Sequence, residues 1–277
     1  MSGRRRLDDE LVRRKLAPSR TQAQADIAGG RVLVGGARAD KAARLVHPGD
    51  AIVLTGDPPR FVSRAGVKLD AALDRFAIDV TGRRVLDAGA STGGFCDCLL
   101  QRGAAEVVAV DVGHGQLHER IAGDARVRVL DRTNVRELDP ALVGAPVDLV
   151  TADLSFISLR LVLDALLRVV RDDGDLVLLV KPQFEAGRQV VSKGRGIVTD
   201  PAVWSEVLAE VTSAIEARGA TIMGAMASPV TGTDGNVEFV VHVRPAGDGR
   251  RDARPDARSL LAAAVAEAEA ARTDRAR

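Results

Sequence analysis

The stretch RRVLDAGASTGG, residues 83–94, decides how the rest of the chain is interpreted. An apolar run ends at Asp87 and a glycine-rich turn follows, which predicts a buried strand, a tight loop and then a helix over residues 95–102. Because glycine has no Cβ, a loop of this kind lets a cofactor lie directly against the backbone. An ordinary strand-to-helix turn gives the same pattern, so the loop alone indicates only a candidate cofactor site.

Strand patterns alternate with helix patterns along the rest of the chain. The expected strands are residues 85–87, 106–112, 127–130, 147–153, 175–181, 221–227 and 237–243. The expected helices between them are residues 95–102, 159–170 and 203–218. This alternation predicts an α/β fold with a doubly wound, Rossmann-like and largely parallel sheet.

Charge is distributed unevenly along the 277 residues, although the formal net charge is only +1. Residues 1–64 contain 13 Lys and Arg against 7 Asp and Glu, whereas the remainder contains 26 against 31. A basic front end on an otherwise acidic chain suggests an anionic polymer as partner, with a solvated basic face as the alternative. The hydrophobic content of 46% is enough for one α/β domain and a smaller one.

The two cysteines, Cys96 and Cys98, cannot close a structural zinc site by themselves, so we expect packing or surface thiols and no metal. The N-terminus is charged from Arg4 onward, and no run of 18 apolar residues occurs. We therefore expect a cytoplasmic protein in a reducing compartment that does not enter a membrane.

Residues 1–58 are predicted to form a small front domain. A helix is expected over residues 7–16, and a second one is expected to begin after the N-cap Ser19 and to continue through Ile27. Short strands are expected at residues 31–34 and 51–54. A unit of this size without a His, Asp or Cys cluster is suited to binding rather than to chemistry.

Two segments of this domain resemble the RNA-binding domain of the S4 ribosomal-protein type: LDDELVRRKLAPSRTQAQADIAGGRVLVGG, residues 7–36, and VHPGDAI, residues 46–52. The resemblance implies RNA binding through basic side chains, here Arg4, Arg5, Arg6, Arg13, Arg14, Lys15, Arg20 and Lys41. No aromatic residue precedes Phe61, so phosphate contacts are expected rather than base stacking.

The sequence Asp57-Pro58-Pro59 marks a linker, assigned to residues 59–64, before the main domain at residues 65–245. A helix capped by Ser63 is expected next, with Val67 facing a core and Lys68 on another side. Residues 246–277 are expected to be a weakly ordered tail, although residues 259–271 are Ala-rich enough for a helix.

The glycine spacing of the loop lacks the second glycine of the nicotinamide pattern G-x-G-x-x-G and instead reads D-x-G-x-x-x-G, which is typical of S-adenosylmethionine loops. Asp111 ends the second strand, where a carboxylate can accept hydrogen bonds from ribose hydroxyls. Asp131 ends the third strand, and either contacts the adenine or caps the following loop. The expected cofactor residues are Asp87, Gly89, Ala90, Ser91, Thr92, Gly93, Gly94, Asp111 and Asp131.

Three ionisable residues stand at other strand ends: Asp153 and Lys181 close strands, and Glu238 begins the last one. The carboxyl ends of parallel strands meet in one crevice, and an antiparallel last strand brings its first residues to the same edge. We therefore expect these side chains to be neighbours. A buried structural ion pair is the alternative explanation for Lys181.

With Lys68 added, the order Lys, Asp, Lys, Glu behind DAGASTGGF resembles the FtsJ-like ribose 2′-O-methyltransferases, whose sheet has seven strands with the last one antiparallel. Together with the front domain, residues 5–245 resemble the TlyA family of ribosomal RNA methyltransferases, including KPQFE at residues 181–185 and KGRGIVTDP at residues 193–201. The resemblance implies S-adenosylmethionine and methylation of a cytidine 2′-hydroxyl in 16S and/or 23S ribosomal RNA within ribosomal subunits. It also implies an effect on susceptibility to cyclic-peptide antibiotics, and we expect a monomer.

The expected catalytic residues are Lys68, Asp153, Lys181 and Glu238. Lys181 would accept or polarise the hydroxyl proton, and Lys68 would position the ribose or its phosphate. Asp153 would orient Lys181 while Glu238 holds Lys68, or the two pairings are exchanged. Two loops, residues 183–199 and 228–235, are predicted either to close over RNA or to be ordinary solvated connections. A non-catalytic RNA chaperone and a membrane-active haemolysin are the alternative functions.

Overall fold

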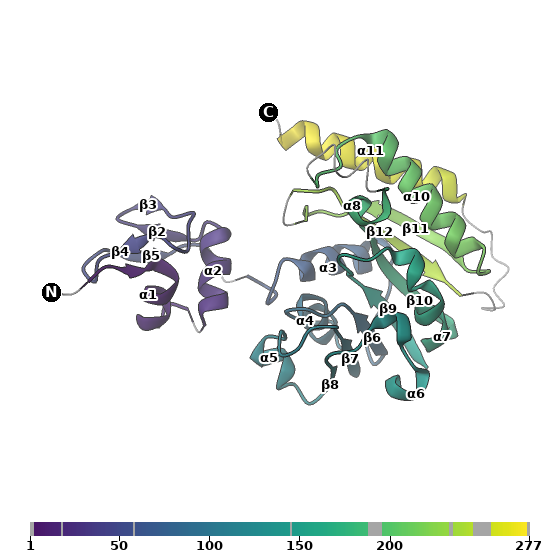
Figure 1. The fold of residues 1–277 in the computed structure, drawn as a ribbon, viewed down its shortest axis with the longest axis horizontal. Helices are drawn as coiled ribbons and strands as arrows, with labels where there is room; N and C mark the ends of the chain where they lie inside the picture. The colour runs from purple at the N-terminus through teal and green to yellow at the C-terminus, as the bar shows by residue number, and fades with distance from the viewer. Residues whose placement is uncertain are drawn as a thin grey trace. The chain divides into compact units, whose positions relative to one another are not determined.

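The chain divides into two compact units, residues 1–63 and residues 64–277. The boundary between them falls within the expected linker. The computed structural model in Figure 1 describes residues 3–17, 19–57, 59–144, 146–187, 196–232, 235–245 and 256–275. Each unit has its own buried apolar cluster.

The first unit packs two helices against short strands. Its elements are β1 (Arg5–Arg6), α1 (Leu7–Arg13), α2 (Arg20–Ala28), β2 (Val32–Val34), β3 (Ala37–Arg38), β4 (Leu45–Val46) and β5 (Ile52–Leu54). The strands pair as β3-β2-β5 and as β1-β4, all antiparallel. Ser19 caps α2 as predicted, since its side chain accepts a hydrogen bond from the Gln22 N–H. Leu7, Leu11 and Ile27 are buried between the helices and the strands.

The second unit contains a seven-stranded sheet in the order β11-β12-β10-β9-β6-β7-β8. Its strands are β6 (Arg84–Ala88), β7 (Glu106–Val110), β8 (Val127–Leu130), β9 (Val147–Ala152), β10 (Val170–Val180), β11 (Thr221–Ala227) and β12 (Phe239–Arg244). Neighbours from β10 to β8 are parallel, while β12 is antiparallel to both β10 and β11. The predicted sheet with an antiparallel last strand is confirmed.

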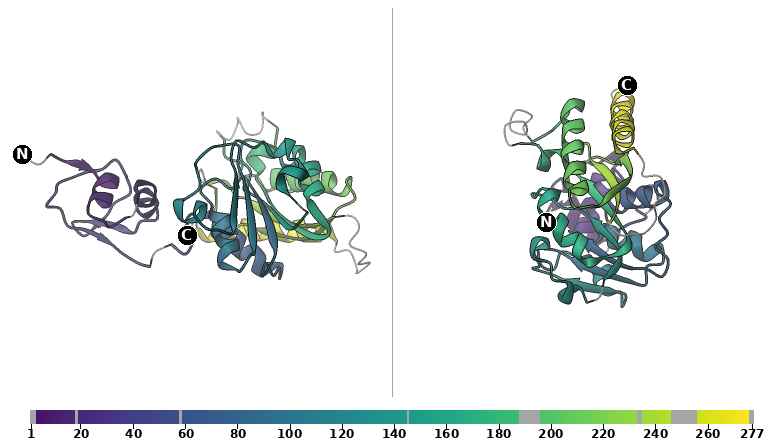
Figure 2. Two further views of the ribbon diagram at one scale, coloured as in Figure 1. Left: turned by 90° about the horizontal axis from the view of Figure 1, so that it is seen from below. Right: turned by 90° about the vertical axis from the view of Figure 1, so that its right-hand side faces the viewer.

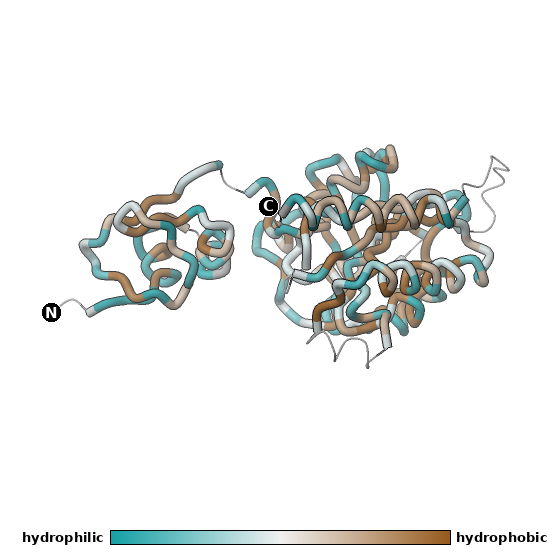
Figure 3. Tube along the Cα trace, turned by 90° about the horizontal axis from the view of Figure 1, so that it is seen from above, coloured by the Kyte–Doolittle hydropathy of each residue, from teal (hydrophilic) through white to brown (hydrophobic). Residues whose placement is uncertain are grey.

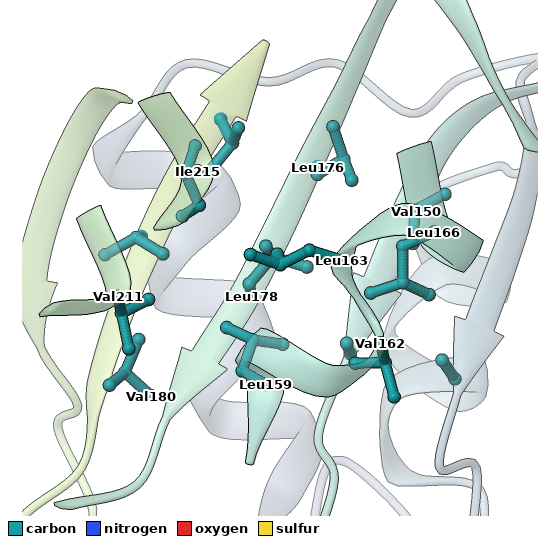
Figure 4. Packing of buried hydrophobic residues seen from close by; sticks show 14 of the residues in the cluster. Val150, Leu159, Val162, Leu163, Leu166, Leu176, Leu178, Val180, Val211 and Ile215 are labelled. Carbon is teal, nitrogen blue, oxygen red and sulfur yellow. The ribbon is translucent and has the colours of Figure 1, made fainter. Parts of the chain in front are cut away.

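Helices cover both faces of this sheet (Figure 2). They are α3 (Ala65–Arg75), α4 (Gly94–Gln101), α5 (Glu119–Ala122), α6 (Pro140–Val143), α7 (Leu163–Val169), α8 (Pro182–Glu185), α10 (Pro201–Glu216) and α11 (Ala257–Arg275), with 3-10 turns at Val135–Glu137 and Leu159–Leu161. Figure 4 shows Leu163 of α7 next to Leu178 of β10 and Leu166 next to Val150 of β9, in one buried cluster that also contains Val211 of α10. Because both faces are covered, the second half of β10, from Leu176 to Val180, is a continuous apolar run.

The C-terminal region differs from the expected weakly ordered tail. Residues 257–275 form the 19-residue helix α11, which buries Leu261, Ala264 and Val265. Figure 3 shows apolar and polar residues interleaved along this helix. Its packing beside β11 and α10 supplies the stability that an Ala-rich helix lacks alone. Residues 246–255 of the expected tail lie outside the described residues.

Helix α3 also corrects two expectations. Its N-cap is Arg64 and has no side-chain cap, so Ser63 does not serve as one. The buried stripe contains Leu69 and Leu73, whereas Val67 is 41% exposed. Lys68 lies on the buried side and is only 7% exposed, because the helix turns this side chain toward the strand ends of the sheet.

Candidate active site

The glycine-rich loop between β6 and α4 lies against the end of β9. Gly89 has φ +83°, and a Cβ placed there would lie 2.8 Å from the Asp153 carbonyl oxygen. Gly93 has φ +91°, and its Cβ would lie 2.9 Å from a Leu117 methyl carbon. Both positions therefore require glycine, and the loop backbone can approach a ligand closely.

Asp87 lies beneath this loop rather than facing it, which corrects its expected contact with a cofactor. The side chain is fully buried; its Oδ1 accepts a hydrogen bond from the Thr151 hydroxyl at 3.1 Å and its Oδ2 one from the Cys96 thiol at 3.0 Å. Burial raises the pKa of Asp87 to about 7. Cys96 is thus a packed thiol that helps to hold the strand end, and burial raises its own pKa well above the usual value.

Asp111, at the end of β7, is fixed by two backbone N–H groups. Its Oδ2 accepts a hydrogen bond from Ser91 N at 2.8 Å, and its Oδ1 accepts one from Gly113 N at 2.7 Å. Beyond β8, Asp131 Oδ2 accepts a hydrogen bond from Gly115 N at 2.9 Å, which holds the Asp131 pKa below its usual value. The exposed Val112 follows Asp111 directly. These anchored carboxylates and the apolar side chain fit a nucleoside next to the loop.

The four expected catalytic side chains meet at the strand ends beside this loop. Lys181 Nζ lies 2.5 Å from Asp153 Oδ1, and Lys68 Nζ lies 2.5 Å from Glu238 Oε2. Asp153 Oδ2 lies 3.6 Å from Lys68 Nζ, so it links the two pairs. Of the two pairings left open by the sequence, Asp153 with Lys181 and Glu238 with Lys68 is the one present.

This cluster is nearly closed to solvent, since each of its side chains is at most 14% exposed. Two ammonium groups face two carboxylates, so the buried charges compensate one another. The Lys181 ammonium also donates a hydrogen bond to the Ser155 hydroxyl at 3.0 Å. A lysine held between a carboxylate and a hydroxyl at a strand end can act on a proton of a nearby nucleophile.

Three residues that sequence reasoning did not single out hold this edge in place. Buried Asn236 accepts a hydrogen bond from Val198 N and donates one to the Gly196 carbonyl. Glu185, in α8, accepts hydrogen bonds from Leu159 N and from the Ser158 hydroxyl. Gly232 leaves room for Glu238, because a Cβ there would lie 2.7 Å from Glu238 Oε1. The only sequence signal for Asn236 and Glu185 is that they lie within four residues of Glu238 and Lys181.

The structure describes only part of each loop that is predicted to move. Residues 188–195 of the loop 183–199 and residues 233–234 of the loop 228–235 lie outside the described residues. Within the described ranges, no cluster of three or more His, Cys, Asp or Glu side chains could hold a metal ion. None of the helices in those ranges combines the length and apolar character that crossing a membrane requires.

The basic residues of the first unit fall into two groups. Arg4, Arg5, Arg13, Lys15, Arg20 and Lys41 are exposed and Arg6 is half-buried. Arg14 instead donates hydrogen bonds to Glu10 and to the backbone carbonyls of Pro48 and Asp50. The structure therefore uses Arg14 to fasten α1 to the turn before β5, and its contact with RNA stays a prediction.

Two family models match the chain in the order of its two units. The S4 domain matches residues 5–52, and the FtsJ-like methyltransferase matches residues 61–244. The chain belongs to the FtsJ-like methyltransferase family. It is therefore a methyltransferase that carries an N-terminal S4 domain, and the expected family and enzyme class are confirmed.

Relatives share this arrangement over nearly their whole length. The 16S/23S rRNA (cytidine-2′-O)-methyltransferase TlyA of Mycobacterium tuberculosis is 50% identical over 245 residues, 88% of this chain and 91% of that protein. A Bacillus subtilis protein, provisionally named rRNA methyltransferase YqxC, is 44% identical over 251 residues, 90% of this chain and 89% of that protein. A solved structure from Streptococcus thermophilus, provisionally named a hemolysin, is 36% identical with a TM-score of 0.74, covering 99% of this chain and 100% of that one.

Proposed function

We propose that this methyltransferase transfers a methyl group from S-adenosylmethionine to the 2′-hydroxyl of a cytidine in ribosomal RNA. The observation that carries the proposal is the cluster of Lys68, Asp153, Lys181 and Glu238 beside the glycine-rich loop. A ribose hydroxyl is a weak nucleophile, so its methylation needs a group that removes or polarises the proton next to the methyl donor.

S-adenosylmethionine supplies a methyl group bound to a positively charged sulfur. The backbone at Gly89 and Gly93 would lie against its methionine part, and the Asp111 carboxylate would accept hydrogen bonds from its ribose. Val112, 76% exposed next to Asp111, offers an apolar surface for the adenine. Asp131 would then hold the loop at residues 114–115 in place rather than reach the base, because Gly115 N already donates to it.

Lys181 is the residue we assign to the 2′-hydroxyl: in its ammonium form it donates a hydrogen bond that polarises the hydroxyl, and it accepts the hydroxyl proton only after it has released one of its own to solvent. Asp153 and Ser155 fix the position of its ammonium group, so the side chain needs no rearrangement when the ribose arrives. Transfer then depends on aligning the ribose oxygen, the methyl carbon and the leaving sulfur. Lys68, held by Glu238, would fix the ribose or a neighbouring phosphate in that line.

An aromatic surface stands next to this centre. Phe156 is 91% exposed and has φ +65°, and its ring lies 5.2 Å from that of Phe184. Phe184 in turn lies 6.0 Å from Lys181 Nζ. We assign Phe156 to stacking on a base turned out toward the site, because an exposed ring beside a catalytic lysine matches the way proteins hold unstacked RNA bases.

The substrate follows from the S4 domain and from the names of the relatives. The exposed basic residues of the first unit would contact RNA phosphates in 16S and/or 23S ribosomal RNA within the subunits. The enzyme would act in the cytoplasm as a monomer without a metal. Loss of its methylation would change susceptibility to cyclic-peptide antibiotics that bind the ribosome.

Incubation of the purified chain with methyl-labelled S-adenosylmethionine and isolated ribosomal subunits tests this proposal. The subunits come from cells that lack the gene, and the product is mapped by the resistance of 2′-O-methylated positions to alkaline cleavage. We expect label at a cytidine ribose in one or both subunits. Label on a base, or none with either subunit, would contradict the proposal.

A further inference from the structure

A carboxylate is buried at the start of α1, in the unit that carries the basic residues. The Asp8 side chain is 0% exposed. Its Oδ1 accepts hydrogen bonds from Arg6 Nε and from Asp9 N. Its Oδ2 accepts hydrogen bonds from Arg6 Nη2, Arg20 Nε and Gln24 Nε2 at 2.9–3.0 Å. The carboxylate thus joins β1, α1 and α2 at one point.

The two arginines bound to Asp8 are themselves open to solvent, since their side chains are 40% exposed for Arg6 and 53% exposed for Arg20. Arg6 places one edge of its guanidinium on the carboxylate, whereas Arg20 contacts it through Nε, which also lies 3.4 Å from Asp9 Oδ1. Within the described ranges, the Nη groups of Arg20 make no hydrogen bond to the protein. The Arg14 guanidinium differs, because its Nε, Nη1 and Nη2 groups donate hydrogen bonds to Glu10 and to backbone carbonyls.

Asp8 remains charged, because the Arg6 guanidinium holds the pKa of that carboxyl well below its usual value. A permanent negative charge would by itself weaken binding to RNA phosphates. The hydrogen bonds of Asp8 to the two arginines should instead strengthen RNA binding. They fix two long side chains in advance, so less conformational entropy is lost when RNA binds, and they align planar donors that suit phosphate oxygens.

We propose that Asp8 is a positioning residue for RNA, which presents Arg6 and Arg20 together as a pair of phosphate-binding forks. The inference rests on the proposed function, since it requires that this unit binds RNA. Positioning and simple charge predict opposite results for one substitution. If Asp8 only adds negative charge, Asp8→Asn strengthens RNA binding; if it positions the arginines, the same change weakens it.

The experiment measures binding of the full chain to isolated 50S and 30S subunits over a series of salt concentrations. The variants are Asp8→Asn, Arg20→Gln and Arg20→Lys, with Asp40→Asn as the control. Asp40 is exposed in the same unit, and its replacement makes the same change in net charge. We expect Asp8→Asn to weaken binding about three- to thirtyfold and to reduce the slope of log affinity against log salt by about one or two. Asp40→Asn should leave affinity unchanged or raise it slightly.

The other variants separate the possible failures. Partial unfolding by Asp8→Asn would lower the fraction of active protein but leave the salt slope unchanged, and thermal denaturation would detect it. Arg20→Lys keeps the charge and loses the fork, so we expect weaker binding; affinity equal to that of the parent would overturn the inference even if Asp8→Asn does not fold. If Arg20→Gln weakens binding and Asp8→Asn strengthens it, positioning is wrong while RNA binding stands. If Arg20→Gln leaves the affinity for both subunits unchanged, the surface around Arg20 does not bind RNA. That result would contradict the part of the proposed function that assigns RNA binding to this surface.

Discussion

Asp153 stands between two lysines, with Oδ1 at 2.5 Å from Lys181 Nζ and Oδ2 at 3.6 Å from Lys68 Nζ. One carboxylate therefore sets the position of the group assigned to the proton and of the group assigned to the ribose. Because Glu238 binds only Lys68 among the described groups, the two acids are not equivalent.

Asp153→Asn should reduce methyl transfer as strongly as Lys181→Ala, by a factor of about 10² to 10⁴. Lys181→Ala removes the ammonium group, and Asp153→Asn removes the negative charge that fixes its position. Neither change replaces a residue of the glycine-rich loop, so the affinity for S-adenosylmethionine should change little. Single-turnover methylation and calorimetric cofactor binding measure the two effects. Asp172→Asn, an exposed site on β10, is the matched control and should behave like the parent. Full activity of Lys181→Ala would exclude its assigned role.

Lys68→Met and Glu238→Gln should not be additive. Lys68→Met leaves the buried Glu238 without an opposite charge, which costs about 3–5 kcal/mol of unfolding free energy. Glu238→Gln costs less, because Asp153 Oδ2 still lies 3.6 Å from Lys68 Nζ, and the double variant leaves neither charge of the pair. Chemical denaturation of the parent, both single variants and the double variant measures the coupling. Additive losses would mean that the 2.5 Å contact between these side chains does not persist in solution.

Gly232→Ala should lower activity without lowering the melting temperature. The added Cβ would lie 2.7 Å from Glu238 Oε1, which ends a flexible side chain, so the carboxylate moves while the backbone stays. Lys68 then keeps opposite charges nearby, at the shifted Glu238 carboxylate and at Asp153 Oδ2 3.6 Å away, but it is no longer held in the position assigned to the ribose contact. Methylation rate and thermal denaturation are measured on the same sample, with cofactor affinity as the internal control. An unchanged methylation rate would mean that the reaction does not depend on the position of the Glu238 carboxylate.

Arg13→Gln and Arg14→Gln should affect different properties, although the residues are adjacent and both bind Glu10. Arg13 is half exposed, and its loss should weaken binding to ribosomal subunits with little change in stability. Arg14 donates to backbone carbonyls before β5, so its loss should lower the stability of the first unit. Each variant is the control for the other. Equal effects on binding and on thermal denaturation would contradict this division.

The buried Asp87 should make stability depend on pH near neutrality. Burial raises its pKa to about 7 in the folded protein, from the usual 3.8 of an aspartate in water, so between these pH values the folded state binds the extra proton. Unfolding free energy should therefore fall as pH rises from about 4 to about 7 and then level off, by up to about 4 kcal/mol.

Asp87→Asn removes this titration while it keeps an oxygen for the Thr151 hydroxyl. Relative to the parent, the variant should become progressively more stable from pH 5 to pH 8. Asp79→Asn, an exposed carboxyl in the same unit, should not show this trend. A flat difference between Asp87→Asn and the parent over this range would mean that Asp87 is not protonated in the folded protein.

The sequence allowed the main strands and the place of the site to be predicted, because buried parallel strands are apolar runs that end in polar residues. Asp153 and Lys181 could be located in this way, and Glu238 through the family's antiparallel strand. The choice between the two pairings depends on side-chain directions at the strand ends, which spacing does not contain. The two-residue strands β1, β3 and β4 were missed, since such short segments carry no periodic pattern.

Tertiary contacts determine the remaining differences. Helix α3 packs through Leu69 and Leu73, so Lys68 lies on its buried side, whereas the expectation that Val67 faces the core had placed Lys68 on another face. Helix α11 is stable through burial of Leu261 and Val265, and Ala-rich composition alone does not indicate that surface. Asn236 and Glu185 act through hydrogen bonds to backbone groups far away in sequence.

The position of β12 between β10 and β11 has a consequence for the synthesis of the enzyme. The glycine-rich loop and both lysines have been made by residue 181, but Glu238 and the strand that joins β11 to the sheet come almost sixty residues later. A nascent or prematurely ended chain can thus form the parallel half of the sheet and still lack the complete centre. The complete four-residue centre therefore requires synthesis beyond residue 238, although the cofactor loop and both lysines are present earlier.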